Sequence, residues 1–320
     1  MTKRTKAWVI VGLLLILAGA ALCAGVLAIN HWGLRGLFTT ELETRAVEFR
    51  EEIHSIAVTA DTEQLRLLPS NDGSCRVIFE EGERQRHTAR VEDGTLRITA
   101  SDTRRWYEKI GVFIGMPTIT VYLPAGEYRE LLVEEDTGDV SIPADFSFAE
   151  IRVSCSTGDV DCRASASGQI VIGTDTGDIR LEGVSAGAMD LGTHTGTVEL
   201  SGAECRGDLG LTVTTGKARL RQVSCKSLFS GGDTGDLRME DLIARERIEV
   251  RRSTGDVQME RCDAGELLIT TDTGDVTGSL LTEKVFLAQS DTGRIEVPET
   301  VSGGTCKIVT ETGDISISVG

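Results

Sequence analysis

The sequence predicts an all-β protein whose larger part is a β-solenoid, a stack of short, similar coils of extended chain. The dipeptide Thr-Gly recurs ten times between Thr137 and Gly313, at spacings of 19 or 20 residues. Apolar and polar residues alternate on both sides of each dipeptide, which is the pattern of half-buried strands. A fixed period near 20 residues indicates one small unit stacked on itself. The glycines of the ten dipeptides are Gly138, Gly158, Gly177, Gly196, Gly216, Gly235, Gly255, Gly274, Gly293 and Gly313.

Each repeat reads as two short strands joined by a turn at Thr-Gly. In the first repeat, Leu131 and Val133 precede the turn, and Val140 and Ile142 follow it. Stacking places such positions in four inward columns, where each buried aliphatic side chain contributes about 1.5–3 kcal/mol. Glycine suits a turn position with positive φ. We therefore expect a single-stranded β-solenoid of about ten two-strand rungs over residues 131–320.

The N-terminus reads as a membrane anchor. Residues 1–6 form a basic tail, and residues 7–29 are an uncharged apolar run. These 23 residues would span about 34 Å as a helix, enough to cross a bilayer with the N-terminus in the cytoplasm. The alternative is a cleaved signal peptide, since Ala18-Gly19-Ala20 resembles a cleavage site, but the apolar run continues nine residues beyond it. We expect a single-pass protein of the cell membrane with its bulk outside.

Two segments separate the anchor from the repeats. Residues 30–52 are rich in charge and read as a juxtamembrane spacer. Residues 53–130 are rich in strand-forming patterns but lie outside the Thr-Gly repeat, with hairpin turns predicted at Asp72-Gly73 and Asp93-Gly94. We expect this irregular β lead-in to form the first rungs and the N-terminal cap.

From this point the chain resembles a known group. Residues 119–124 (ITVYLP), then Leu131-Leu132-Val133, then the repeated Asp-Thr-Gly-Asp-Val resemble the bacterial putative-adhesin family of unknown function, over about residues 50–320. The resemblance implies a β-solenoid on the bacterial envelope. It also implies an association of some relatives with envelope stress responses and neighbouring two-component systems. It supplies no catalytic residues.

Composition and motifs favour a binding protein over an enzyme. The net charge of −17 argues against nucleic acid and against an anionic membrane surface as partners. Asp-Thr-Gly also occurs in aspartic proteases, but Asp, instead of Ser or Thr, usually follows it here. No nucleophile–base pair, phosphate loop or cofactor fingerprint is evident. Polysaccharide-cleaving β-helices build a cleft from long loops, for which rungs of 19–20 residues leave little room.

Acidic residues flank the turns in columns. Asp139, Asp159 and Asp178 directly follow their glycines, as do four later acids, and neighbouring rungs should lie about 4.8 Å apart. Like charges this close repel each other, and bound calcium would relieve the repulsion. The alternative is that each Asp caps its own turn through backbone N–H groups. Interruptions of the column by Thr197, Lys217 and Arg294 favour capping. We therefore expect no cofactor, with calcium as the alternative.

Three further features suggest, in turn, a contact with a partner, a covalent link between rungs and self-association. The segment 101–116 holds the one aromatic cluster outside the anchor, and Arg104, Arg105, Trp106, Tyr107 and Phe113 are the candidate partner-contact residues, which would otherwise fold over the open N-terminal end. Cys205 and Cys225 lie at equivalent positions of adjacent repeats, where a disulfide is an alternative to free thiols.

The last repeat runs to Gly320 without a capping segment, so the C-terminal rung is a candidate for self-association. We expect a non-catalytic binding, adhesion or envelope-stress-sensing module. Its partner would be a cell-surface or envelope component or a membrane sensor protein. The alternatives are a calcium-stabilised surface stalk and, less favoured, a polysaccharide-acting enzyme.

Overall fold

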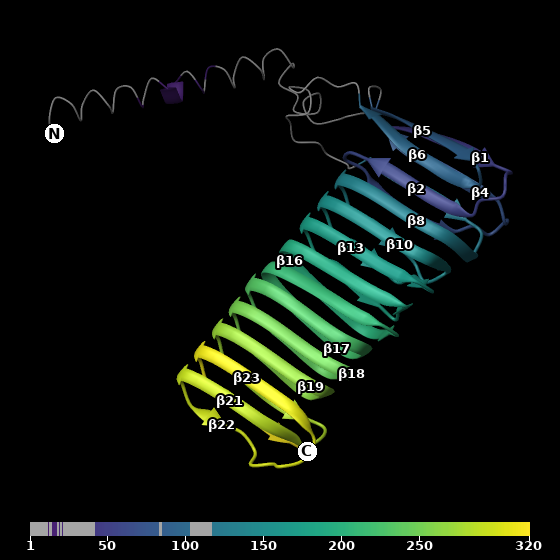
Figure 1. Cartoon of the computed structure of the whole chain (residues 1–320). Helices are drawn as coiled ribbons and strands as arrows, with labels where there is room; N and C mark the ends of the chain where they lie inside the picture. Colours follow the sequence, from purple (N-terminus) through teal and green to yellow (C-terminus); the bar gives the residue numbers. More distant parts are fainter. Residues whose placement is uncertain are drawn as a thin grey trace.

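The computed structural model describes residues 42–82, 85–102 and 117–320, together with residues 12, 15–17, 19 and 21 of the N-terminal segment. Residues 42–320 form one elongated stack of strands, with a cap at the N-terminal end (Figure 1). The predicted all-β solenoid of about ten turns is confirmed.

The strands of the N-terminal part include the antiparallel pairs that close the stack. They are β1 (Glu43–Phe49), β2 (Ser55–Ala60), β3 (Gln64–Pro69), β4 (Cys75–Glu81), β5 (Gln85–Glu92), β6 (Thr95–Asp102) and β7 (Thr118–Leu123).

The repeat region consists of parallel strands, several of which run through more than one side of a rung. They are β8 (Gly126–Thr137), β9 (Val140–Ile142), β10 (Phe146–Thr157), β11 (Val160–Cys162), β12 (Ser165–Ala166), β13 (Gln169–Thr176), β14 (Ile179–Glu182), β15 (Ser185–Ala186), β16 (Ala188–Cys205), β17 (Asp208–Thr234), β18 (Leu237–Thr254), β19 (Val257–Thr273), β20 (Val276–Leu280), β21 (Lys284–Thr292), β22 (Ile295–Glu296), β23 (Gly304–Thr312) and β24 (Ile315–Val319).

Each central rung has three sides, and not the two that the alternation predicts. Face A contains the residues before each Thr-Gly, where Ile151 pairs with Leu131 and Ile170. Face B follows the turn, where Val160 pairs with Val140 and Ile179. Face C is a further short parallel ladder, seen where Phe148 pairs with Tyr128 and Ala166. The two-strand rung was therefore wrong, because the two or three residues of face C are too few to show a period.

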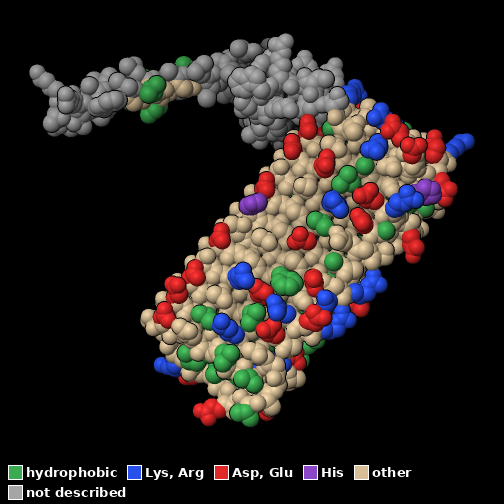
Figure 2. Space-filling model, in the orientation of Figure 1, with side chains coloured by type: hydrophobic (Ala, Val, Ile, Leu, Met, Phe, Trp, Pro, Cys, Tyr) green, Lys and Arg blue, Asp and Glu red, His purple; other side chains and the backbone are tan. Residues whose placement is uncertain are grey.

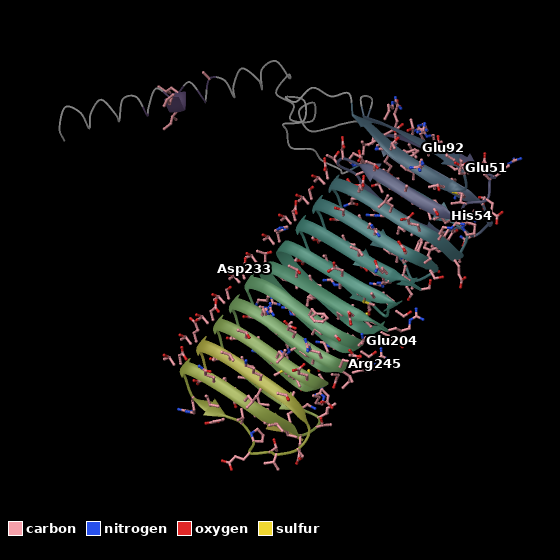
Figure 3. The ribbon with its side chains drawn as sticks, viewed as in Figure 1. Glu51, His54, Glu92, Glu204, Asp233 and Arg245 are labelled. Atoms are coloured by element: carbon pink, nitrogen blue, oxygen red, sulfur yellow. The ribbon has the colours of Figure 1, made fainter. Side chains whose placement is uncertain are left out.

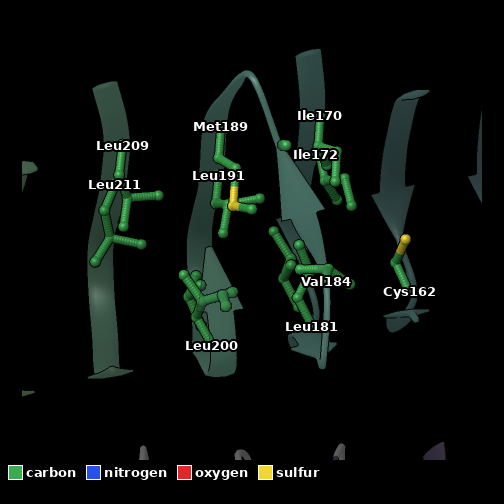
Figure 4. Packing of buried hydrophobic residues seen from close by; sticks show 14 of the residues in the cluster. Cys162, Ile170, Ile172, Leu181, Val184, Met189, Leu191, Leu200, Leu209 and Leu211 are labelled. Carbon is green, nitrogen blue, oxygen red and sulfur yellow. The ribbon is translucent and has the colours of Figure 1, made fainter. Parts of the chain in front are cut away.

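The core is the space enclosed by the three faces. Aliphatic side chains of face A and face B stack in register from rung to rung, as Ile170, Met189 and Leu209 do (Figure 4). Face C contributes smaller buried residues, among them Ala186, Cys205 and Cys225. Near the cap the larger Tyr128 and Phe148 fill this side, and the core is continuous along the stack.

The Thr-Gly turns are the closest approach between rungs. Gly216 has φ of 140°, and a Cβ added there would lie 1.8 Å from the carbonyl oxygen of Gly196 in the preceding rung. Most other Thr-Gly glycines combine a positive φ with the same approach. Glycine is required here for its conformation and for its missing side chain.

Hydroxyl groups inside the stack bind the turn carbonyls. Thr174, three residues before its Thr-Gly glycine, is buried, and its Oγ1 donates to the carbonyl of Gly158, at 3.3 Å. Thr193 donates in the same way to Gly177, at 3.1 Å. These bonds satisfy carbonyl groups that lie at a corner of the core, where an unpaired one would cost stability.

At the N-terminal end the chain leaves its sequential order. The rung formed by β2 and β3 lies directly against β8 and β9, while the later strands β6 and β7 lie one layer further out. The antiparallel strands β5 and β4 then cover β6 and β7, and β1 covers β4. The cap therefore replaces parallel rung pairing with hairpin-like pairing.

The last two repeats also exchange places. Strand β23 lies between β19 and β21, and β24 lies between β20 and β22 (Figure 1). The chain forms the outermost rung first and then returns to fill the layer beneath it. The premise that the C-terminal rung is the open end was therefore wrong, because β23 and β24 are paired on both sides and the open edge belongs to β21 and β22.

We predict that Gly216→Ala destabilises the fold by at least about 2 kcal/mol, because the new Cβ meets a carbonyl oxygen in a strained backbone conformation. Gly231→Ala on the same strand is the matched control, since nothing lies within 4 Å of its added Cβ. Urea unfolding of the two variants measures the difference. Equal midpoints for both variants would contradict the close stacking of the turns.

Candidate functional site

The predicted contact residues Arg104, Arg105, Trp106, Tyr107 and Phe113 lie outside the described residues. The described surface offers a different candidate, which we call the serine groove. It is a hollow of about 430 Å³ along face C, lined by Glu127, Tyr128, Ser147, Phe148, Ala149, Ser165, Ala166, Ser167, Ser185, Glu204 and Arg206.

The serine groove has a regular row of hydroxyl groups. Ser147 pairs with Ser165 in the next rung, and the backbone N–H of Ser185 donates to Ser165 Oγ at 3.0 Å. Tyr128 and Phe148 lie beneath, both buried, with ring centroids 5.7 Å apart. The Tyr128 hydroxyl donates to the Pro124 carbonyl at 2.7 Å. Burial and this hydrogen bond hold the two rings in place, so the row of serine hydroxyls lies over an ordered aromatic surface.

A second hollow continues the serine groove toward the cap. It measures about 610 Å³ and shares Glu127 and Tyr128 with the first. Its other walls come from residues 49–54 between β1 and β2, the turn at 72–75, and residues 124–126. Figure 3 shows Glu51 and His54 of this hollow on the same long edge of the stack as Glu204. The two hollows adjoin at Glu127 and Tyr128, and we refer to them together as the channel.

Basic side chains continue this edge beyond the groove. Arg206, Lys226 and Arg245 each stand ten residues after a Thr-Gly glycine in three successive rungs, and we call them the basic corner. The Arg206 guanidinium donates to the Ser167 carbonyl at 2.7 Å, and that of Arg245 donates to the Arg206 carbonyl. Lys226 Nζ lies 3.5 Å from Glu246 Oε2. Two of the three cations are thus anchored by backbone carbonyls, in a protein of net charge −17.

The opposite long edge carries the Thr-Gly turns and is acidic (Figure 2), with Asp233 on it in Figure 3. Here each Asp after the glycine caps the next rung, and not its own turn as the sequence suggested. Asp139 Oδ1 accepts the N–H of Asp159 at 3.0 Å, and Asp159 Oδ1 accepts that of Asp178 at 2.8 Å. One oxygen of each carboxylate is therefore engaged by the backbone.

Capping of this kind links the columns without a metal ion. Among the residues that the structure describes, no group of three His, Cys, Asp or Glu side chains has the geometry to hold one. Calcium binding at the acidic columns stays a prediction.

A buried ionic cluster lies in the cap, which the sequence analysis missed. His87 of β5 is buried, with Nε2 3.0 Å from Glu63 Oε1 and Nδ1 3.0 Å from Glu81 Oε2. Arg45 Nε lies 2.9 Å from Glu81 Oε1. The imidazole also stacks on Phe79, at 5.2 Å between centroids. The cluster ties β1, β4 and β5 to the turn between β2 and β3.

The environment of the cluster favours the ionic forms of its members. Burial disfavours a charged imidazole, but the carboxylates of Glu63 and Glu81 raise the pKa of His87 above its ordinary value. Burial also opposes ionisation of Glu81, but hydrogen bonds from Arg45 and His87 lower the pKa of Glu81 to about 2. The contacts within the cluster therefore favour the imidazolium form of His87 and the carboxylate form of Glu81.

Glu135 on β8 has the opposite tendency. Its side chain is buried, and burial, reinforced by the negative charge of Glu63, raises the pKa of Glu135 to about 9. Its neutral form is favoured at pH 7. Glu135 occupies the inward position that Thr174 and Thr193 hold in later rungs.

A buried cation lies further along the same inward position. Arg252 is buried and donates to the Val213 carbonyl at 3.3 Å, the Gly231 carbonyl at 3.2 Å and Ser230 Oγ at 3.0 Å. Gly232 makes the space, because a Cβ there would lie 1.9 Å from Arg252 Nη1. The signal in the sequence is Gly232, at the position where the other rungs carry larger residues.

The described cysteines are free thiols. Cys205 and Cys225 are aligned in adjacent rungs but not bonded, so the disulfide alternative was wrong. Burial raises the pKa of the Cys225 thiol to about 12, and the same holds for Cys162 and Cys306. These thiols are protonated and act as small apolar core residues.

The predicted anchor, residues 7–29, lies mostly outside the described part of the chain. In the described part, no helix is both long enough and apolar enough to cross a membrane.

We predict that Glu135→Gln makes the protein more stable at neutral and alkaline pH, by about 1–3 kcal/mol at pH 8. The folded state binds a proton at Glu135 up to about pH 9, whereas the unfolded state releases it near 4.5, so this group lowers stability as pH rises between the two values. Unfolding midpoints from pH 5 to 9 measure the slope. Glu134→Gln, at an exposed neighbour, should retain the wild-type slope, and an unchanged slope in Glu135→Gln would contradict the account.

Several solved structures resemble the fold. A putative adhesin from Bacteroides fragilis is 14% identical, with a TM-score of 0.44, and the match covers 88% of this chain and 98% of that one. A putative adhesin from Parabacteroides distasonis is 8% identical, with a TM-score of 0.49, covering 87% and 97%. A protein described as lipid-binding, also from Parabacteroides distasonis, is 13% identical, with a TM-score of 0.37, covering 88% and 98%.

The comparison with curated proteins finds no match. The family model described as Toastrack DUF4097 matches residues 53–229 and 208–319, which together make up most of the chain. The resemblance deduced from the repeated turns is thereby confirmed, and the protein belongs to the Toastrack DUF4097 family.

Proposed function

We propose that the protein is a non-catalytic binding module of the adhesion type, which holds a polyhydroxylated polymer of the cell envelope along the serine groove. The observation that carries the proposal is the row of Ser147, Ser165 and Ser185, set at rung spacing in a channel that continues toward the cap. An extended polymer can bond to such a row at each rung, whereas a compact ligand would use one part of it.

The groove chemistry suits a neutral or weakly acidic glycan. Serine hydroxyls both donate and accept hydrogen bonds, as sugar hydroxyls do. Glu127 and Glu204 offer acceptors at the rims, and Arg206 offers donors to hydroxyl or carboxylate groups. The basic corner then extends the channel with positive charge, which would slow the release of an acidic polymer.

Anchoring is part of the proposal. Residues 7–29 would hold the chain in the membrane, with the stack outside and the cap nearest the bilayer. The serine groove opens beside the cap, so it would lie close to the inner layers of the envelope. Family membership supports a binding role, and the two adhesin descriptions agree with it.

The test is co-sedimentation of the full chain, in detergent, with isolated cell-wall sacculi at moderate salt. We expect the wild type to be retained. Ser185→Trp fills the groove from an exposed position and should weaken retention about tenfold or more. Ser141→Trp, at an exposed serine of face B outside the groove, should be retained like the wild type.

Two results would overturn the proposal. Equal retention of all three proteins would move binding away from the groove. No retention of the wild type would remove the polymer as ligand and point to a membrane-protein partner, such as a sensor.

A further inference from the structure

The exchange of the last two rungs leaves β21 as the outermost strand of face A. Among the described strands, β21 pairs with β23 alone, so its other edge presents unpaired N–H and C=O groups. The loop after β22 bonds to the start of β21, where the Thr300 hydroxyl donates to the Lys284 carbonyl and the Ser302 hydroxyl donates to Glu283 just before the strand. Residues 285–292 therefore form an open edge.

This edge lacks the features that usually prevent strand addition. Its one cation, Lys284, is turned inward, with its side chain 4% exposed and Nζ 2.6 Å from Asp263 Oδ1. Strand β21 contains no proline. By contrast, β22 at the edge of face B has two residues and is soon followed by Pro298. A short edge strand followed by proline thus protects face B, whereas β21 on face A has nine residues, no proline and Asp291 as its one outward charge.

Apolar side chains are exposed at the same end. Leu287 is 56% exposed, Ile295 41% and Leu281 47%, and Phe286 is only partly buried. Ile295 occupies an inward column, and its counterparts in other rungs are fully buried because a further rung covers them. Figure 2 shows hydrophobic side chains gathered toward this end of the visible face. An added layer would bury this surface.

We propose that two copies of this chain associate through β21, edge to edge and antiparallel, to form a closed dimer. In a register centred on Ala288, Phe286 faces Ser290 of the partner subunit, so a large inward side chain meets a small one. Leu287 faces Gln289 of the partner subunit, and Val285 faces Asp291 of the partner subunit. No like charges face each other in this register, and the strand is complementary to itself.

The other end of the stack does not offer an equivalent partner. The edge strands there, β1 and β5, expose Glu43, Glu48, Arg86 and Arg90. Such charges resist burial against the apolar end of a second copy. A symmetric pair through β21 is therefore favoured over a head-to-tail filament.

The test is sedimentation velocity of the full chain in detergent at about 1 to 100 µM, a range suited to micromolar dimers. We expect a dimer, which Leu287→Lys with Gln289→Lys weakens at least tenfold. Leu268→Lys with Thr270→Lys is the matched control, because these residues hold the same outward positions on β19, inside the stack. The control should remain dimeric, and thermal unfolding confirms that each variant is folded.

Cross-linking tests the register independently. The described cysteines are buried, so a single exposed cysteine can be oxidised selectively. In a Cys23→Ser background, a mixture of Leu287→Cys chains and Gln289→Cys chains should form a disulfide-linked dimer. A monomeric wild type, a dimer that the edge variant leaves intact, or equal loss in edge and control variants would each overturn the proposal.

Discussion

The close stacking of the Thr-Gly turns sets the geometry on which the rest of the structure depends. At these turns the backbone of one rung lies so near the next that a Cβ would meet a carbonyl oxygen at about 2 Å. The turn column fixes the axial register, and the register places Val, Ile and Leu of successive rungs above each other. The repeated Asp then bonds the next rung on the outside, and a threonine hydroxyl bonds the turn carbonyl on the inside.

The repeat period and the alternation sufficed to predict the solenoid, because both follow directly from stacking and from the pleat of a strand. Face C could not be predicted in this way, since its two or three residues per rung show no period. The exchanged order of the last rungs did leave a signal. Asp275 Oδ1 accepts the N–H of Asp314, and Asp314 Oδ1 accepts that of Arg294, so the outermost rung carries Arg294 where the rungs directly beneath it carry Asp. An Asp is not needed there because no further rung follows.

The candidate site was harder to predict than the fold. The serine groove depends on Ser147, Ser165 and Ser185, which are far apart in sequence and ordinary in composition, and only the stack aligns them. The cluster of His87, Glu63 and Glu81 likewise comes from three separate segments, brought together because the cap leaves sequential order. The pairing of the strands thus determines which polar residues become neighbours. Local sequence patterns do not predict these neighbours.

One principle connects both ends of the molecule. A stack of parallel rungs has two ends with unpaired strand edges. In this chain the two ends differ in whether further strands cover them. At the N-terminal end, antiparallel strands and a buried ionic cluster close the core. At the C-terminal end, the chain returns beneath its own last rung and leaves an apolar edge outermost. The serine groove lies along one side, next to the closed end, so the proposed anchoring and the proposed association would use different ends.

The most direct test of this account is a pair of engineered disulfides that reads the rung order. Leu268 of β19 pairs with Lys307 of β23, which in turn pairs with Leu287 of β21. Cysteines at positions 268 and 307 should therefore cross-link under mild oxidation. Cysteines at positions 268 and 287 should not, because two rung spacings, about 9.6 Å, separate them. Cross-linking of the second pair and not the first would show that the rungs follow sequential order and would contradict the account.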